Sequence, residues 1–300
     1  MFALMTLSEI FRKYLHELGQ LYSQNEASQI TSIAFDSLAG LQRADVVKDP
    51  SMIISGETLG ILENALLRLK KHEPIQHVTG QAWFCDLAFK VTRDVLVPRP
   101  ETEELVMLAS AFIKGQRLGV LDIGTGSGCI PIALQTMHAN IACTAIDIST
   151  EALAIAKHNA DVHKCSIQFK LLDFLNESCW SQLEQVDVIM SNPPYIPDTD
   201  KKTLDKNVLQ FEPHEALFEP AGQPLIFYHK IAEFGIRNLK AGGNIFVEIH
   251  EDFGKEVLKI FSNAGYQAEL KKDMFGKERF MVGRISGLTT EDTEGFHREH

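Results

Sequence analysis

Up to about residue 75, apolar side chains recur at the spacing of an amphipathic helix. Thr6-Leu7-Ser8-Glu9 has the pattern of a capping box, so we expect a helix to begin there. Asn25 is a candidate cap for a second helix, and Ser55 or Thr58 for another. Their apolar stripes are Leu7, Ile10, Phe11, Tyr14, Leu15 and Leu18; Ala27, Ile30, Ile33, Ala34 and Leu38; and Leu59, Leu62, Leu66 and Leu69. Such stripes are typical of packed cores and predict a small helical bundle.

The apolar period changes from helical to two after this bundle. Pro74 is expected to end the helical region, and alternation runs from Trp83 to Val97. Arg93-Asp94 is a predicted turn, after which Val95-Leu96-Val97 resumes the strand pattern. We therefore expect a β-hairpin that joins two domains.

From Leu105 onward, segments with strand and helix periods alternate. This order predicts an α/β fold with a parallel, doubly wound sheet, whose ligands bind beyond the carboxyl ends of the strands. The expected strands are 118–123, 141–146, 167–172, 186–190, 244–249, 266–271 and 280–283, and the expected helices are 128–137, 151–163, 225–239 and 255–264. The predicted division is a helical domain over residues 1–80, a hairpin linker over 81–100, an α/β domain over 101–285 and a polar, disordered tail over 286–300.

Composition narrows the class of protein. The chain is 45% apolar, lacks an apolar run long enough to span a membrane, and begins without a basic signal-peptide region. Its five cysteines form no Cys-x-x-Cys pair and no His-Glu-x-x-His occurs, so we expect reduced thiols, a cytoplasmic location and no metal site. The net charge of −11 weighs against nucleic acid as a direct partner.

A glycine-rich loop points to a nucleoside cofactor. Gly124-Thr125-Gly126-Ser127-Gly128 leads from a predicted strand into a helix, and Asp147 ends the next strand, where a carboxylate can accept both ribose hydroxyls. A dinucleotide and S-adenosylmethionine both fit this outline. Asp122 favours S-adenosylmethionine, because a carboxylate beside the loop would repel a pyrophosphate and tolerates a sulfonium. Phe174, after the third strand, is a candidate surface for the adenine ring, although core packing is the alternative.

A proline-rich corner follows the fourth strand. Ser191-Asn192-Pro193-Pro194-Tyr195 comes directly after an apolar run, and two consecutive prolines stop the strand because they cannot donate backbone hydrogen bonds. Asn192 is held extended by the proline that follows it. The Asn192 side-chain carbonyl and the Pro193 carbonyl are therefore candidate acceptors for a planar –NH2 group, beside the ring of Tyr195.

With these motifs, the chain resembles the class I methyltransferases that methylate planar nitrogens, and within them the release-factor glutamine N5-methyltransferases. The resemblance covers residues 7 to 284 approximately. The stretches that narrow it are Glu73-Pro74-Ile75-Gln76-His77-Val78-Thr79-Gly80, Val95-Leu96-Val97-Pro98-Arg99-Pro100-Glu101-Thr102-Glu103, Asn207 to Leu217, and Lys272-Asp273-Met274-Phe275-Gly276-Lys277-Glu278-Arg279. Ala82-Trp83-Phe84-Cys85 instead resembles a sister family that methylates ribosomal protein L3.

The resemblance implies a Rossmann-like, mostly parallel seven-stranded sheet preceded by a helical domain that contacts the substrate. It implies S-adenosylmethionine as cofactor, bound by the glycine loop, Asp147, Phe174 and Asn192. It also implies a release factor as protein substrate, whose Gly-Gly-Gln glutamine binds Asn192-Pro193-Pro194-Tyr195, with Asn192, Pro193 and Tyr195 catalytic. The alternatives are the glutamine of ribosomal protein L3 and an adenine N6 or guanine N2 amine of nucleic acid. A dinucleotide-dependent oxidoreductase is disfavoured by Asp122 and by the lack of an acid–base pair for hydride transfer.

Overall fold

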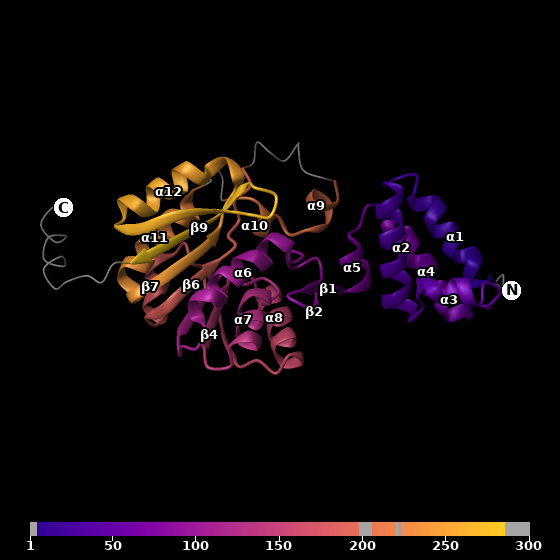
Figure 1. The fold of residues 1–300 in the computed structure, drawn as a ribbon, viewed down its shortest axis with the longest axis horizontal. Coiled ribbons are helices and arrows are strands. Elements are labelled where there is room, and N and C mark those ends of the chain that lie inside the picture. The colour runs from indigo at the N-terminus through magenta and orange to yellow at the C-terminus, as the bar shows by residue number, and fades with distance from the viewer. Residues whose placement is uncertain (1–4, 198–205, 220–221, 224, 286–300) are drawn as a thin grey trace, which may run out of the picture. The chain divides into compact units, whose positions relative to one another are not determined.

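The chain divides into two compact units. The computed structural model describes residues 5–197, 206–219, 222–223 and 225–285 (Figure 1). One unit is formed by the described parts of Met1–Gln81 and Leu204–Phe211, and the other by those of Ala82–Thr203 and Glu212–His300. The tail predicted for residues 286–300 lies outside the described residues.

The first unit is helical. Its helices are α1 Leu7–Leu18, α2 Gln24–Ala39, α3 Arg43–Lys48, α4 Gly56–Leu69, α5 Ile75–Thr79 and α9 Lys206–Phe211. The capping box predicted at Thr6 and Glu9 is confirmed, whereas Ser23 rather than Asn25 caps α2. The predicted apolar stripes meet in one core, where Phe35 packs edge-on against Phe11 and Tyr14. Ile33 was wrongly assigned to a stripe, because it is 43% exposed and lies outside that core.

We expected Pro74 to end the helical region, and this was wrong. Pro74 is instead the N-cap of α5. Proline is well suited to the start of a helix because it lacks the N–H that would have no partner there. The preceding Glu73 is buried and accepts two hydrogen bonds from Arg68, at 2.8 and 2.9 Å. The same guanidinium donates to the carbonyls of His77 and Val78, which fastens α5 to α4. The Glu73–Gly80 motif is thus a structural clamp within this unit.

The hairpin is shorter than predicted. Strand β1 Gln81–Phe84 pairs with β2 Leu87–Lys90, and the turn lies at Cys85 and Asp86 rather than at Arg93-Asp94. Both turn residues have positive φ, 48° and 60°, as a two-residue hairpin turn of the primed type requires. Residues 91–97 follow and form no strand. Val91, Val95 and Val97 are buried there, and these apolar positions were wrongly interpreted as the alternation of a strand.

The second unit is a seven-stranded sheet in the order β5-β4-β3-β6-β7-β9-β8. All neighbouring strands from β5 to β7 are parallel, and β9 is antiparallel to β7 and β8. The strands are β3 Gly119–Ile123, β4 Ala142–Asp147, β5 Ile167–Leu171, β6 Val186–Ser191, β7 Leu239–Glu248, β8 Tyr266–Lys272 and β9 Glu278–Ile285. The predicted fold class, a mostly parallel Rossmann-like sheet, is confirmed.

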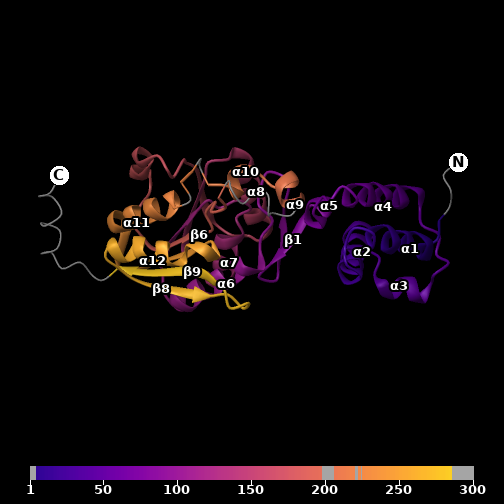
Figure 2. The ribbon, with the colours of Figure 1, turned by 90° about the horizontal axis from the view of Figure 1, so that it is seen from above.

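Helices cover both faces of this sheet (Figures 1 and 2). They are α6 Pro100–Ile113, α7 Cys129–Met137, α8 Thr150–Val162, α11 Ile226–Asn238 and α12 Gly254–Asn263. The short helix α10 His214–Leu217 and the 3₁₀ segments Glu177–Gln182 and Glu251–Phe253 lie in the connections between these elements. Successive strand residues enter opposite cores: Leu121 packs with the side of α11 and α12, and Val120 with the side of α6 and α7. The parallel strands are therefore apolar on both faces, which is why they read as continuous apolar runs.

Candidate active site

A cavity of about 740 Å³ opens at the carboxyl ends of the parallel strands. This is the size of a small-molecule site, and it lies where an open α/β sheet is expected to bind ligands. The cavity brings together nearly all of the predicted site residues. Those that line it are Gly124, Thr125, Gly126, Ser127, Asp147, Phe174, Asn192, Pro193 and Pro194. Gly128 and Tyr195 lie beside it without being among its lining residues.

The loop after β3 presents its backbone to the cavity. Gly124 and Gly126 have φ of +73° and +53°, a conformation that other L-residues adopt only with strain. A Cβ on either would meet no protein atom within 4 Å, so the open space beside them is available to a ligand. Gly128 differs, because a Cβ there would lie 3.1 Å from the Cβ of Ala156. Its observed position permits the close approach of α7 to α8, and its predicted contact with a cofactor stays a prediction.

Asp147, the last residue of β4, is held in a fixed orientation by that loop. One carboxylate oxygen accepts from the Gly126 N–H at 2.8 Å and the other from the Ser149 N–H at 3.0 Å. Burial raises the pKa of Asp147, and these backbone donors offset part of the rise. A carboxylate oxygen has a second lone pair, so the group can still accept from a ribose.

Buried polar atoms without partners gather under the loop. Asp122 is fully buried, and burial raises its pKa to about 7, with the nearby Thr125 hydroxyl offsetting part of the rise. Within the described residues, neither Asp122 oxygen, nor the hydroxyls of Thr125 and Ser127, has a partner in hydrogen-bond geometry. Unpaired buried polar groups are costly, so this cluster lowers the local stability beneath the glycine loop.

The cavity is also acidic. Two arginines, Arg93 and Arg99, are among its described lining residues. The carboxylates that line it are Asp94, Asp147, Glu151, Asp173, Glu215 and Glu219. An excess of carboxylates favours a cationic ligand and disfavours a pyrophosphate. The lining thus fits the sulfonium and ammonium groups of S-adenosylmethionine better than a dinucleotide.

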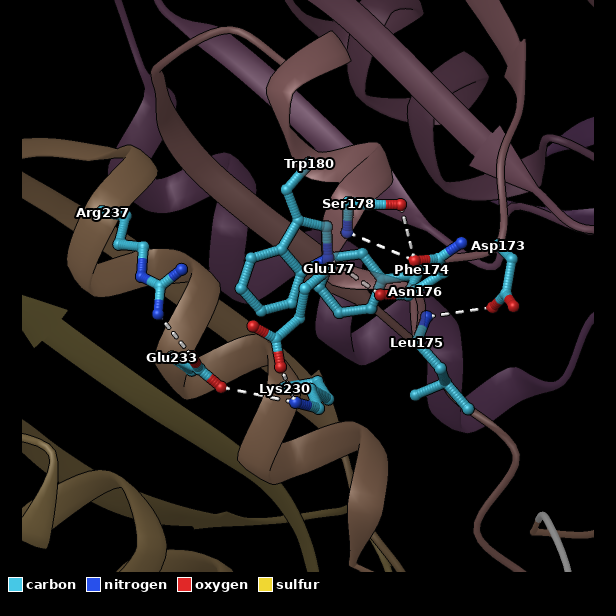
Figure 3. Close-up of polar contacts among 10 residues, drawn as sticks. All are labelled: Asp173, Phe174, Leu175, Asn176, Glu177, Ser178, Trp180, Lys230, Glu233 and Arg237. Atoms are coloured by element: carbon cyan, nitrogen blue, oxygen red, sulfur yellow. Dashed lines mark hydrogen bonds and ion pairs between the residues drawn. The ribbon is translucent and has the colours of Figure 1, made fainter.

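The Phe174 side chain is more deeply buried in the core than a ring that stacks on a ligand needs to be. It is 5% exposed, and its ring stacks on that of Trp180, with centroids 5.6 Å apart (Figure 3). The Trp180 indole N–H donates to the Phe174 carbonyl at 2.8 Å, and Lys230 and Arg237 lie over the indole ring. The core alternative is therefore well supported for this side chain, which still borders the cavity. Contact with adenine stays a prediction.

The proline corner directly follows β6, the strand that pairs with β3. It therefore lies next to the glycine loop, which directly follows β3. The side-chain amide of Asn192 donates to the Thr102 hydroxyl at 3.1 Å. Tyr195 turns its hydroxyl toward Glu248 and donates to it at 2.9 Å. The expected packing of the Tyr195 ring on a substrate amide stays a prediction.

Three groups that shape this site were given no role in it from the sequence, although Arg99 and Thr102 lie in a stretch that carries the family resemblance. Thr102, in the first turn of α6, lines the cavity, and buried Glu248 ends β7. Arg99 lines the cavity and donates to the buried Glu212 at 2.7 Å, which ties the start of α6 to the segment before α10. Glu248 could have been predicted from the sequence, because it is a carboxylate at the end of an apolar strand. Ligands of such sheets bind beyond the carboxyl ends of the strands. The Arg99–Glu212 pairing has no comparable signal, because it joins positions far apart in the chain.

The described residues contain neither a membrane-spanning helix nor a metal-binding cluster. None of their helices is long and apolar enough to cross a membrane. Across the same residues, no three His, Cys, Asp or Glu side chains are grouped so that they could hold a metal ion.

Comparison with known proteins gives consistent relatives. A family model described as "Methyltransferase small domain" matches residues 105–232. The release factor glutamine methyltransferase of Flavobacterium psychrophilum is 36% identical over 284 residues, covering 92% of this chain and 98% of that protein. That of Bacteroides thetaiotaomicron is 38% identical over 267 residues, covering 88% and 95%. A solved protein-(glutamine-N5) methyltransferase (release factor-specific) from Alicyclobacillus acidocaldarius is 26% identical, covers 66% of this chain and 99% of its own, and aligns with a TM-score of 0.42.

Proposed function

The chain belongs to the release factor glutamine methyltransferase family, and on that premise we propose that it methylates the N5 atom of a glutamine in a peptide chain release factor. The substrate glutamine is that of the Gly-Gly-Gln motif, S-adenosylmethionine is the methyl donor, and the cytoplasm is the site of action. One observation carries the proposal for the site: the glycine loop, Asp147 and the Asn192-Pro193 corner line the same acidic cavity.

The donor half of the cavity is formed by Gly124-Thr125-Gly126-Ser127 and Asp147. Asp147 would accept from the ribose hydroxyls, and the backbone of the glycine loop would border the amino-acid part of the donor. Phe174 is the candidate neighbour of the adenine. When bound, S-adenosylmethionine supplies a methyl group activated by a positively charged sulfur, which the surrounding carboxylates tolerate.

The acceptor half is the corner after β6. A carboxamide nitrogen is a poor nucleophile because its lone pair is delocalised into the carbonyl group. The Asn192 side-chain oxygen and the Pro193 carbonyl would accept its two hydrogens, which aims the nitrogen and stabilises the positive charge that develops on it. Pro194 borders the amide, and the ring of Tyr195 is expected to contact its plane.

The first test compares substrates and one variant. The protein is incubated with labelled S-adenosylmethionine and a release factor, ribosomal protein L3 or DNA, and we expect label in the release factor at its Gly-Gly-Gln glutamine. We expect Asn192→Ala to lose most turnover, by about 100-fold or more if positioning dominates, with little change in donor affinity by isothermal titration. Label in L3 or DNA alone would contradict the proposed substrate, and near-normal turnover of the variant would contradict the role of Asn192.

A further inference from the structure

A chain of hydrogen bonds links Asn192 to Thr102 and Glu248. The Asn192 amide nitrogen lies 3.1 Å from the Thr102 hydroxyl oxygen, which lies 2.7 Å from a carboxylate oxygen of Glu248. The three residues come from the loop after β6, the first turn of α6 and the end of β7. Thr102 and Glu248 are 3% and 1% exposed, so bulk water competes little with these hydrogen bonds.

Glu248 is held from several sides. Its other carboxylate oxygen accepts from the Tyr195 hydroxyl at 2.9 Å, and its backbone carbonyl accepts from the Tyr228 hydroxyl at 3.1 Å. Burial raises the pKa of Glu248, the Thr102 and Tyr195 hydroxyls and Arg279 oppose the rise, and Glu101 adds to it. One carboxylate therefore fixes the proline corner at two points, Asn192 through Thr102 and Tyr195 directly.

The direction of these hydrogen bonds follows from the inventory of donors. An ionised carboxylate only accepts, so the single hydroxyl hydrogen of Thr102 must point to Glu248. The Thr102 oxygen can then only accept from Asn192, so the Asn192 atom that faces it must be the –NH2 nitrogen. The orientation of an asparagine amide has to be assigned from its hydrogen-bond network, and with Glu248 ionised the network allows one answer. The Asn192 carbonyl is left as the free end of the amide.

We infer that Glu248 and Thr102 are positioning residues that hold the Asn192 carbonyl oxygen toward the substrate, so that the site selects a primary amide. This inference rests on the proposed role of Asn192 as acceptor. A reversed Asn192 would present –NH2 to the substrate –NH2, and two donors cannot form a hydrogen bond with each other. Neither Glu248 nor Thr102 needs to touch the reacting atoms for this effect.

The decisive test is a matched pair at residue 102. Thr102→Val keeps the shape of the side chain and removes the hydroxyl, whereas Thr102→Ser keeps the hydroxyl and removes the methyl group. We expect the Val variant to lower kcat by about two- to tenfold, the factor that one hydrogen bond of ordinary strength carries, with unchanged donor affinity. We expect the Ser variant to restore most of that turnover. Wild-type kcat in the Val variant, or equal losses in both variants, would overturn the inference, since equal losses indicate packing alone.

A second readout uses pH and Glu248→Gln. A protonated Glu248 can donate to Thr102, which frees the Thr102 hydrogen and removes the constraint on Asn192. At saturating donor, wild-type kcat should therefore fall as pH is lowered through the raised pKa of Glu248. The charged and titratable groups that face this carboxyl are Glu101 of α6, Tyr195, Tyr228 of α11 and Arg279 of β9. Glu248→Gln should be slow at all pH values and lack this acidic limb, and an identical limb in that variant would overturn the inference.

Asn192→Ala is assayed in parallel to separate this inference from the proposed function. If Asn192→Ala remains active, the proposed role of Asn192 is wrong. If Asn192→Ala is inactive while Thr102→Val is fully active, the role of Asn192 stands and only the positioning by Thr102 and Glu248 is wrong. Thermal unfolding of each variant shows whether a loss of turnover is a loss of folding.

Discussion

Three carboxylates at the strand ends, of which Asp122 and Glu248 are buried and Asp147 is half-buried, differ in what surrounds them, and their tasks differ accordingly. Asp147 accepts from two backbone N–H groups, Asp122 has no partner in hydrogen-bond geometry among the described residues, and Glu248 accepts from two hydroxyls. The first is suited to orient a neutral polyol, the second to favour a nearby cation, and the third to fix the direction of other side chains. Residue type alone does not distinguish these tasks.

For a single residue, the prediction is that Asp147→Ala weakens S-adenosylmethionine binding by about 10- to 100-fold. This is the range expected when one or two hydrogen bonds to a charged group are lost. Isothermal titration measures the dissociation constant. Asp161→Ala is the matched control, because it removes an exposed carboxylate from α8 outside the cavity lining. An unchanged dissociation constant in Asp147→Ala would remove Asp147 from the ribose.

At the scale of secondary-structure elements, the close packing of α7 against α8 depends on the absence of a side chain at Gly128. Gly128 has φ of +79°, and an added Cβ would lie 3.1 to 3.3 Å from atoms of Ala156 and Ile132. We expect Gly128→Ala to destabilise the second unit by about 2 kcal/mol, through backbone strain and crowding combined. Differential scanning calorimetry measures the loss.

Gly60→Ala is the control for that substitution. Gly60 lies in α4 with ordinary helical backbone, is exposed, and an added Cβ meets nothing within 4 Å. The change to alanine should stabilise the first unit by roughly 0.5 to 1 kcal/mol, because it reduces the freedom of the unfolded chain. Equal effects of the two substitutions would refute the packing role of Gly128.

Most strands of the sheet could be predicted from the sequence to within a few residues, because buried parallel strands leave continuous apolar runs. The exception is β7, which was expected at 244–249 and is Leu239–Glu248, because Lys240-Ala241-Gly242-Gly243 at its start is not an apolar run. β6 was expected at 186–190 and is Val186–Ser191, and β8 was expected at 266–271 and is Tyr266–Lys272. The hairpin turn was misplaced because Val91 and Val97 are buried without being in a strand. Thr102 and Glu248 are 146 positions apart, and no local pattern records a contact that only the folded sheet creates.

For the whole molecule, we propose that the helical unit recognises the protein substrate away from the reacting glutamine. Its most exposed aliphatic side chains among the described residues are Val47, Leu67 and Ile53, at 79%, 59% and 54%. Replacing them together with serine should raise KM for the intact release factor severalfold, in line with a combined contribution of about 1 kcal/mol from side chains that are not hot spots, and leave kcat unchanged. A short Gly-Gly-Gln peptide is the control substrate, and its kinetics should not change. An unchanged KM for the intact factor would exclude these side chains from recognition.

The two tryptophans of the chain differ sharply in environment. Trp83 is 68% exposed, whereas Trp180 is 5% exposed and lies against Phe174 at the border of the cavity. Indole emission shifts to shorter wavelength when water is excluded, so the intrinsic fluorescence of this protein has a solvent-facing and a shielded emitter. Replacing Trp83 with phenylalanine leaves Trp180 as the single indole of the protein, beside the donor half of the cavity. Its emission is then an optical probe of that region that needs no label.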